Sequence, residues 1–196
     1  ERGFSDETIK KFELGYALDE WSAFTDTALE KKYELSYLEK TGLTIVNENK
    51  RFDRFKGRVI FPIHSMSGRV LGFGGRTLLK DAKVAKYVNS PESEIYHKSK
   101  ILYGIFQAKQ RIAQLDSCYL VEGYTDVISL HQAGIENVVA SSGTALTQDQ
   151  IRLLQPLGIF TVVVFDREVD RLDAAEIIFV EHILAPRDGH RLFPQE

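Results

Sequence analysis

Two groups of carboxylates follow apolar runs that we expect to form neighbouring strands. They are Glu122 and Asp126 after the first run, and Asp166 and Glu168 after the second. In an open parallel sheet, ligands bind outside the carboxyl ends of the strands, so acids placed there should converge. Converging carboxylates without His or Cys are the ligands that Mg²⁺ or Mn²⁺ prefers. The alternative, that each acid only caps the helix that follows it, stays open at this stage.

The spacing within each group suits a shared pocket. Gly123 allows the chain to turn sharply behind Glu122, and Asp126 falls in the first turn of the next helix. Asp166 and Glu168 are two residues apart, so an extended chain projects both to one side. Divalent ions held there would stabilise a phosphoryl group under attack, which indicates phosphoryl or nucleotidyl transfer.

The charge of the chain is divided along its length. Residues 50–111 carry 14 Lys and Arg against 4 Asp and Glu, whereas residues 112–196 carry 5 against 13. A basic segment can hold phosphates while an acidic segment holds metal ions, so the division favours an enzyme that acts on a polyanion. The alternative is a solvated basic face with no partner.

Several basic residues have neighbours that suit a nucleic-acid strand. Arg76 follows two glycines, which predicts close approach of a phosphate chain to the backbone and the guanidinium. Lys86 and Tyr87 place a charge beside an aromatic face, and Lys98 extends the same patch. Phosphate held by Lys, with a base packed on Tyr, is a common mode of single-strand binding. For each residue the alternative is an ordinary surface cation.

The composition is that of a globular chain. It has 196 residues, 43% of them hydrophobic, and a single cysteine, Cys118, in an apolar run. One cysteine excludes a disulfide framework or a structural zinc site within the chain and favours a reducing, cytoplasmic location. The chain starts at Glu1 without Met, so we expect a fragment of a longer protein, and no apolar run reaches the length of a membrane span.

The periodicity of apolar residues predicts an α/β fold with two parts. Residues 1–115 should form a mixed α/β subdomain with a basic surface, and residues 116–196 a βαβαβ unit with a parallel sheet. The expected helices begin near Ser5, Trp21, Ser36, Tyr103, Asp126 and Thr147, and one spans Leu172–Leu184. The expected strands are Leu43–Val46, Arg58–Ile63, Arg69–Phe73, Lys86–Val88, Cys118–Val121, Asn137–Ala140 and Phe160–Phe165, with a last strand near His190.

Several motifs in one order resemble the bacterial DnaG-type primases. They are Phe12–Ala17, Arg58–Ile63, Gly72–Arg76, Lys86–Glu92, Tyr96–Lys98, Leu102–Gly104 and Val121–Val127. The resemblance covers nearly the whole chain and implies that its second part is a Toprim domain, cut short at the C-terminus.

The resemblance implies an activity and its partners. Such proteins are nucleotidyltransferases that make short RNA primers on single-stranded DNA from ribonucleoside triphosphates, with two or more Mg²⁺ or Mn²⁺ ions. They carry zinc only in a separate preceding domain and bind a replicative helicase through a following one; we expect both to be missing here.

The resemblance also implies residue roles. The catalytic set is Glu122, Asp126, Asp166 and Glu168, with Glu122, Asp166 and Glu168 as metal ligands. The nucleic-acid and nucleotide-binding set is Arg58, Arg76, Lys86, Tyr87, Asn89 and Lys98.

One segment departs from the family pattern. The second acidic motif of the family reads Asp-Gly-Asp-x-Ala-Gly, and here Arg167 and Arg171 replace its glycines while Glu168 replaces an Asp. Added positive charge beside a metal ion is unfavourable. An inactive nucleic-acid-binding core is therefore one alternative. A Toprim nuclease or topoisomerase is another, although nothing marks the nucleophilic Tyr that a topoisomerase needs.

Overall fold

The computed structural model describes residues 3–48, 50–79, 84–141, 146–157, 161–165 and 177–181. The helices are α1 (Asp6–Lys11), α2 (Ala23–Glu30), α3 (Leu35–Lys40), α4 (Ile105–Leu115), α5 (Tyr124–Gln132) and α6 (Gln148–Leu154), with 3₁₀ turns η1 (Lys98–Lys100) and η2 (Gln155–Leu157). The strands are β1 (Gly15–Tyr16), β2 (Thr44–Asn47), β3 (Lys50–Asp53), β4 (Arg58–His64), β5 (Val70–Thr77), β6 (Tyr87–Asn89), β7 (Ser117–Val121), β8 (Val138–Ala140), β9 (Thr161–Phe165) and β10 (Ile177–Glu181). Among the described residues, every helix is too short or too polar to cross a bilayer.

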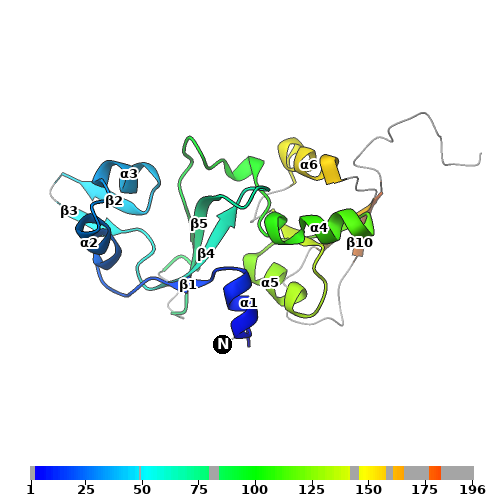
Figure 1. The fold of residues 1–196 in the computed structure, drawn as a ribbon, viewed down its shortest axis with the longest axis horizontal. Coiled ribbons are helices and arrows are strands. Elements are labelled where there is room, and N and C mark those ends of the chain that lie inside the picture. The colour runs from blue at the N-terminus through cyan, green and yellow to red at the C-terminus, as the bar shows by residue number, and fades with distance from the viewer. Residues whose placement is uncertain are drawn as a thin grey trace, which may run out of the picture.

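These strands form three sheets. A central antiparallel sheet has the order β1-β4-β5-β6, a second sheet has the order β10-β9-β7-β8, and β2 and β3 form a separate hairpin. In Figure 1 the hairpin lies with α2 and α3 at one end, the central sheet lies in the middle, and α4, α5 and α6 lie at the other end. Strand β7 pairs in parallel with both β8 and β9, so the predicted α/β fold with parallel strands is confirmed.

One predicted helix is wrong. Residues Ile177–Glu181, inside the expected helix Leu172–Leu184, form β10, which pairs antiparallel with β9. The segment Ile-Ile-Phe-Val is rich in branched and aromatic residues that favour strands, and a short apolar run does not reveal its period. The second sheet is therefore mixed. The rest of that helix and the strand expected near His190 fall outside the described residues.

Two helices, α1 and α6, begin at a residue whose side chain caps the helix. Ser5 Oγ accepts a hydrogen bond from the Thr8 N–H at the start of α1. At α6 the capping box is complete, because Thr147 Oγ1 accepts from the Gln150 N–H while Gln150 Oε1 accepts from the Thr147 N–H. Each satisfied donor stabilises a helix end that would otherwise be unpaired.

One hydrophobic cluster crosses the boundary expected after residue 115. It contains Phe12 of α1, Phe61 of β4, Tyr103, Val121 of β7 and Tyr124 of α5, all buried. The rings of Phe61 and Tyr124 stack with centroids 5.5 Å apart, and those of Tyr103 and Tyr124 meet at 4.6 Å. The two parts of the chain thus share a core, while the exact domain boundary stays a prediction.

Three glycines on β5 let aromatic rings pack directly onto the strand backbone. A Cβ atom at Gly72 would lie 2.6 Å from the Tyr96 ring, one at Gly75 would lie 2.6 Å from the Phe55 ring, and one at Gly74 would overlap the Tyr124 ring. Aromatic rings therefore fill the space that side chains at Gly74 and Gly75 would occupy, on both faces of the strand. Close approach of a phosphate chain to the Arg76 segment stays a prediction.

This packing predicts that Gly74→Ala is strongly destabilising. The added methyl group would displace Tyr124 and open the contact between the sheets, and we expect the free energy of unfolding to fall by about 1–3 kcal/mol. Urea-induced unfolding would measure the change. The matched control is Gly15→Ala on β1, where a Cβ meets nothing within 4 Å, and where we expect a change of about 0.5 kcal/mol or less. Equal effects of the two substitutions would contradict the packing argument.

Candidate nucleic-acid and metal site

The first acidic group lies at the carboxyl end of β7. Glu122 directly follows this strand and is exposed. Strands β7 and β9 run in parallel register up to Leu120 opposite Val164, one residue before each strand ends, so both strands finish at the same edge of the sheet. Asp166 and Glu168, which follow β9 in the sequence, lie outside the described residues. Their convergence with Glu122 stays a prediction.

Asp126 has a structural use. Its side chain is buried, and Oδ2 accepts a hydrogen bond from the Gly123 N–H at 3.2 Å, at the start of α5. A Cβ atom at residue 123 would lie 2.7 Å from the same oxygen, so glycine is what lets the carboxylate close this contact. The capping alternative thus holds for Asp126, and its catalytic role stays a prediction.

The acidic residues that the structure describes have the donor atoms that a hard divalent cation prefers, but they supply only part of the ligand set that such an ion needs. Among the residues that the structure describes, no group of three or more His, Cys, Asp or Glu could hold a metal ion. Glu122 offers an exposed carboxylate at the carboxyl end of β7. All the ligands predicted from the sequence are carboxylates. Carboxylate oxygen is the donor that Mg²⁺ and Mn²⁺ prefer.

Arg76 and Tyr87 lie opposite each other on β5 and β6. The Arg76 guanidinium carbon is 5.8 Å from the centroid of the Tyr87 ring, a cation–π distance. Its buried Nε finds no hydrogen-bond partner among the described residues. The side chain of Lys86, directly before β6, is exposed. The structure therefore brings these three predicted binding residues together at one edge of the central sheet.

Arg58 lies beneath that edge. It is only 8% exposed, and its Nη1 donates to the carbonyl oxygens of Ala85 at 2.9 Å and Lys86 at 3.4 Å. Burial lowers the pKa of its guanidinium. Arg58 thus holds the main chain that leads into β6, and a contact from Arg58 to nucleic acid stays a prediction.

Asn89, at the end of β6, joins this strand to the first turn of α5. Its Oδ1 accepts a hydrogen bond from the Tyr124 hydroxyl at 2.9 Å, and the Tyr124 and Tyr87 rings meet edge to face at 6.1 Å. Tyr124 was not singled out from the sequence. The available signal was an aromatic residue directly after the glycine of the acidic motif, with bare glycines on β5 to receive it.

Lys98 begins η1 and is held through its main chain. Its N–H donates to Glu92 Oε1 at 2.9 Å, and this bond is the main reason that the pKa of Glu92 is lowered. Its carbonyl oxygen accepts from Gln150 Nε2 at 3.3 Å, and the same amide donates to the Ile101 carbonyl at 2.9 Å. Gln150 is fully buried. In the sequence it stands out only as the Gln that follows Thr147 by three residues, the spacing of a capping box.

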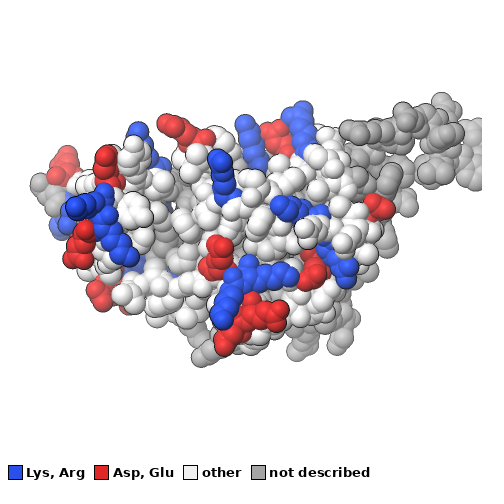
Figure 2. Space-filling model, in the orientation of Figure 1, with Lys and Arg blue, Asp and Glu red and all other residues white. Residues whose placement is uncertain are grey.

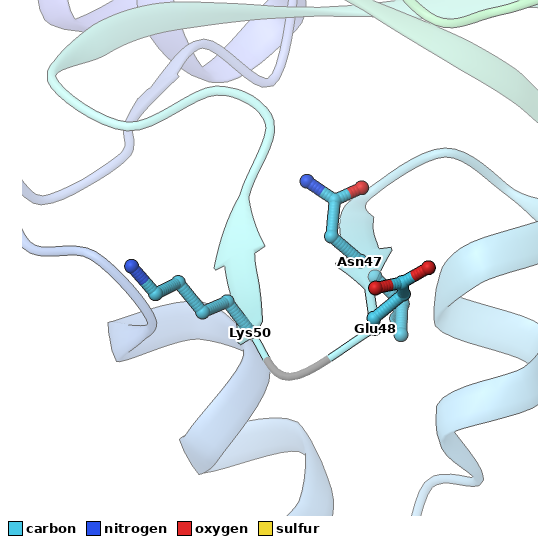
Figure 3. A pocket seen from close by; sticks show the side chains of 4 residues that line it. Asn47, Glu48 and Lys50 are labelled. Carbon is cyan, nitrogen blue, oxygen red and sulfur yellow. The ribbon is translucent and has the colours of Figure 1, made fainter.

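Other surface features lie away from these residues. On the face shown in Figure 2, basic and acidic side chains of the described residues are interspersed. Figure 3 shows a hollow at the tip of the β2–β3 hairpin, lined by Val46, Asn47, Glu48 and Lys50, where the side chains of Glu48 and Lys50 point apart. None of the residues predicted to bind nucleic acid or metal lines this hollow.

Comparison with known proteins identifies the family. Residues 1–109, more than half of the chain, match the family described as the N-terminal domain of the DNA primase catalytic core. The chain belongs to the DNA primase family. Residues 119–178 of this primase chain match a second family, described as Toprim-like.

Relatives and solved structures agree with this family. The DNA primase of Synechococcus elongatus is 42% identical over 176 residues, which cover 88% of this chain and 25% of the relative. The zinc-binding and RNA polymerase domains of Aquifex aeolicus primase superpose with a TM-score of 0.77 at 38% identity, covering 84% and 40% of the two chains. A DnaG primase catalytic domain bound to single-stranded DNA gives 0.74 at 39% identity, covering 86% and 52%. The chain spans about a quarter of the length of the curated primases it matches.

The buried amide of Gln150 predicts that Gln150→Ala destabilises the primase chain. The substitution leaves the Lys98 and Ile101 carbonyls without this donor, and we expect a loss of about 1–3 kcal/mol in the free energy of unfolding. Urea-induced unfolding would measure it. Gln148→Ala, at an exposed position two residues earlier in α6, is the control and should change stability by about 0.5 kcal/mol or less. An unchanged midpoint for Gln150→Ala would show that η1 is held by other contacts.

Proposed function

We propose that this chain is the part of a primase that joins ribonucleoside triphosphates into a short RNA primer on a single-stranded DNA template. The contact between Asn89 of β6 and Tyr124 of α5 is the observation that best supports this proposal. It holds β6, which carries Tyr87, follows Lys86 and pairs with the Arg76 segment of β5, against the start of α5, two residues after Glu122. A polymerase needs this combination, because it must hold a polyanionic template next to the site of nucleotidyl transfer.

The residues divide the work between two surfaces. Those proposed to hold template and nucleotide phosphates are Arg76, Lys86, Tyr87, Asn89 and Lys98, with Arg58 beneath them. Those proposed to hold Mg²⁺ or Mn²⁺ are Glu122, Asp166 and Glu168. Two or more ions bound there would neutralise the triphosphate and lower the barrier to attack by a 3′-hydroxyl. Asp126 supports Glu122 by fixing the turn at Gly123.

The partners of the whole protein are part of the proposal. A related catalytic domain has been seen with single-stranded DNA, which supports a DNA template here. A replicative helicase bound through a separate domain, a zinc ion held in another domain and a cytoplasmic location stay predictions.

A nucleic-acid-binding core without polymerase activity is the second candidate. It is favoured by Arg167 and Arg171, which stand in the segment that follows β9 where the family pattern has glycines. A primer-synthesis assay on single-stranded DNA, beside a binding assay with the same template, separates the two functions. Synthesis would support the polymerase, and binding without synthesis would support the second candidate.

Glu122→Gln is expected to abolish primer synthesis while leaving single-strand affinity within about twofold of the parent. The amide keeps the shape of the side chain and removes the charge that holds a cation. Incorporation of labelled ribonucleotides and fluorescence anisotropy of a labelled oligonucleotide would measure the two properties. The control is Glu39→Gln on α3, which is exposed at the other end of the molecule (Figure 1). Retained synthesis in Glu122→Gln would refute the metal assignment.

Lys86→Ala is expected to weaken binding of single-stranded DNA and to flatten its dependence on salt. Each phosphate contact by a lysine releases about 0.7 of a counterion from a single strand, so the slope of log K against log salt should become shallower by about that amount. Anisotropy titrations at several salt concentrations measure the slope. Lys40→Ala, at an exposed position on α3, should leave it unchanged. A slope for Lys86→Ala equal to that of the parent would argue against a phosphate contact there.

A further inference from the structure

We propose that Tyr124 is a positioning residue, which holds Asn89 and Tyr87 in the place where they bind single-stranded nucleic acid beside Glu122. The inference rests on the proposed function. It assigns a role to an uncharged residue that lies between the acidic residues Glu122 and Asp126. Tyr124 follows Glu122 by two residues, so the same short segment supplies the proposed metal ligand and the residue that supports β6.

Tyr124 makes three contacts with strands β5 and β6. Its hydroxyl donates to Asn89 Oδ1 at 2.9 Å, its ring meets the Tyr87 ring at 6.1 Å with an interplanar angle of 67°, and the ring covers the backbone of Gly74. Tyr124 is only 3% exposed. A buried ring held by backbone and by neighbouring rings has little freedom, so it is a firm support for the half-buried Asn89.

The hydrogen bond also decides how Asn89 can meet a ligand. An asparagine amide has one accepting oxygen and two N–H donors. Because the Tyr124 hydroxyl donates to Oδ1, the orientation of the amide is fixed and its two N–H donors remain suited to phosphate or base oxygens. A side chain fixed before binding loses less conformational entropy when the ligand arrives, so the support raises affinity.

Tyr103 provides a matched control for the hydroxyl of Tyr124. It belongs to the same cluster, with its ring centroid 4.6 Å from that of Tyr124, and it is equally buried. Its hydroxyl finds no hydrogen-bond partner among the described residues. Removing either hydroxyl takes one oxygen from the same core, but only Tyr124→Phe removes the contact to Asn89.

The test measures binding of a fluorescent single-stranded oligonucleotide by four variants of the chain beside the parent. These are Tyr124→Phe, Tyr103→Phe, Asn89→Ala and the double substitution Tyr124→Phe with Asn89→Ala. We expect Tyr124→Phe to raise Kd about three- to tenfold, the effect of one lost hydrogen bond. Its salt slope should equal that of the parent, because no charge is removed. Tyr103→Phe should bind as the parent does.

The double substitution separates positioning from general loss of structure. If Tyr124 acts through Asn89, Kd of the double variant should match that of Asn89→Ala alone, because the second change has nothing left to remove. Stoichiometric titration should show the same fraction of binding-competent protein in all variants, which a merely unfolded population would lower.

Three outcomes would overturn the inference. The first is a Kd of Tyr124→Phe equal to that of the parent, and the second is an equal loss of affinity in Tyr124→Phe and Tyr103→Phe. The third is a double variant whose increase in Kd equals the product of the increases in Tyr124→Phe and Asn89→Ala. Each of these leaves the proposed function intact if the parent binds single-stranded DNA and makes primers. A parent chain that binds no single-stranded DNA would overturn the proposed function and this inference together.

Discussion

The ring of Tyr124 packs onto the bare backbone of β5 at Gly74, and this contact joins the antiparallel sheet to the sheet that contains β7. Phe61 stacks on this ring and Tyr103 meets it edge to face, so the cluster of rings draws on both parts of the chain. Close packing of rigid rings leaves little room for one sheet to shift against the other. The placement of β6 and of Lys86 before it, relative to the carboxyl end of β7, therefore depends on this contact.

The basic residues are held in place mainly through main-chain atoms. Arg58 binds the carbonyl of Lys86, and Gln150 binds the carbonyl of Lys98. The bridge between Tyr103 and Ala140, with N···O distances of 2.9 and 3.0 Å, attaches the same segment to β8. These bonds fix the course of the chain through the main-chain carbonyl groups of the two lysines. The surface proposed to bind a polyanion is thus held rigidly from beneath.

Local features of the fold were predictable because they depend on neighbours in sequence. The caps at Ser5 and Thr147 and the strand–helix unit from β7 to α5 follow from residue types a few positions apart. For the segment that forms β10 the sequence pattern predicts a helix, since four consecutive apolar residues satisfy both the helical and the strand period. Its pairing with β9 is a long-range contact, and no local pattern encodes it.

The residues alone show which chemical groups the chain carries and in what order, and they reveal its family. These groups are the acids after β7 and β9 and the cations from Arg58 to Lys98. The contacts of each group, in contrast, arise only when the chain folds. In the folded chain, Asp126 caps α5 and Arg58 lies buried against the main chain before β6. Aromatic rings cover the glycines of β5, and the Tyr124 hydroxyl donates a hydrogen bond to Asn89. The reason is physical, because a side chain's role depends on the atoms that pack against it, and those atoms come from distant parts of the chain.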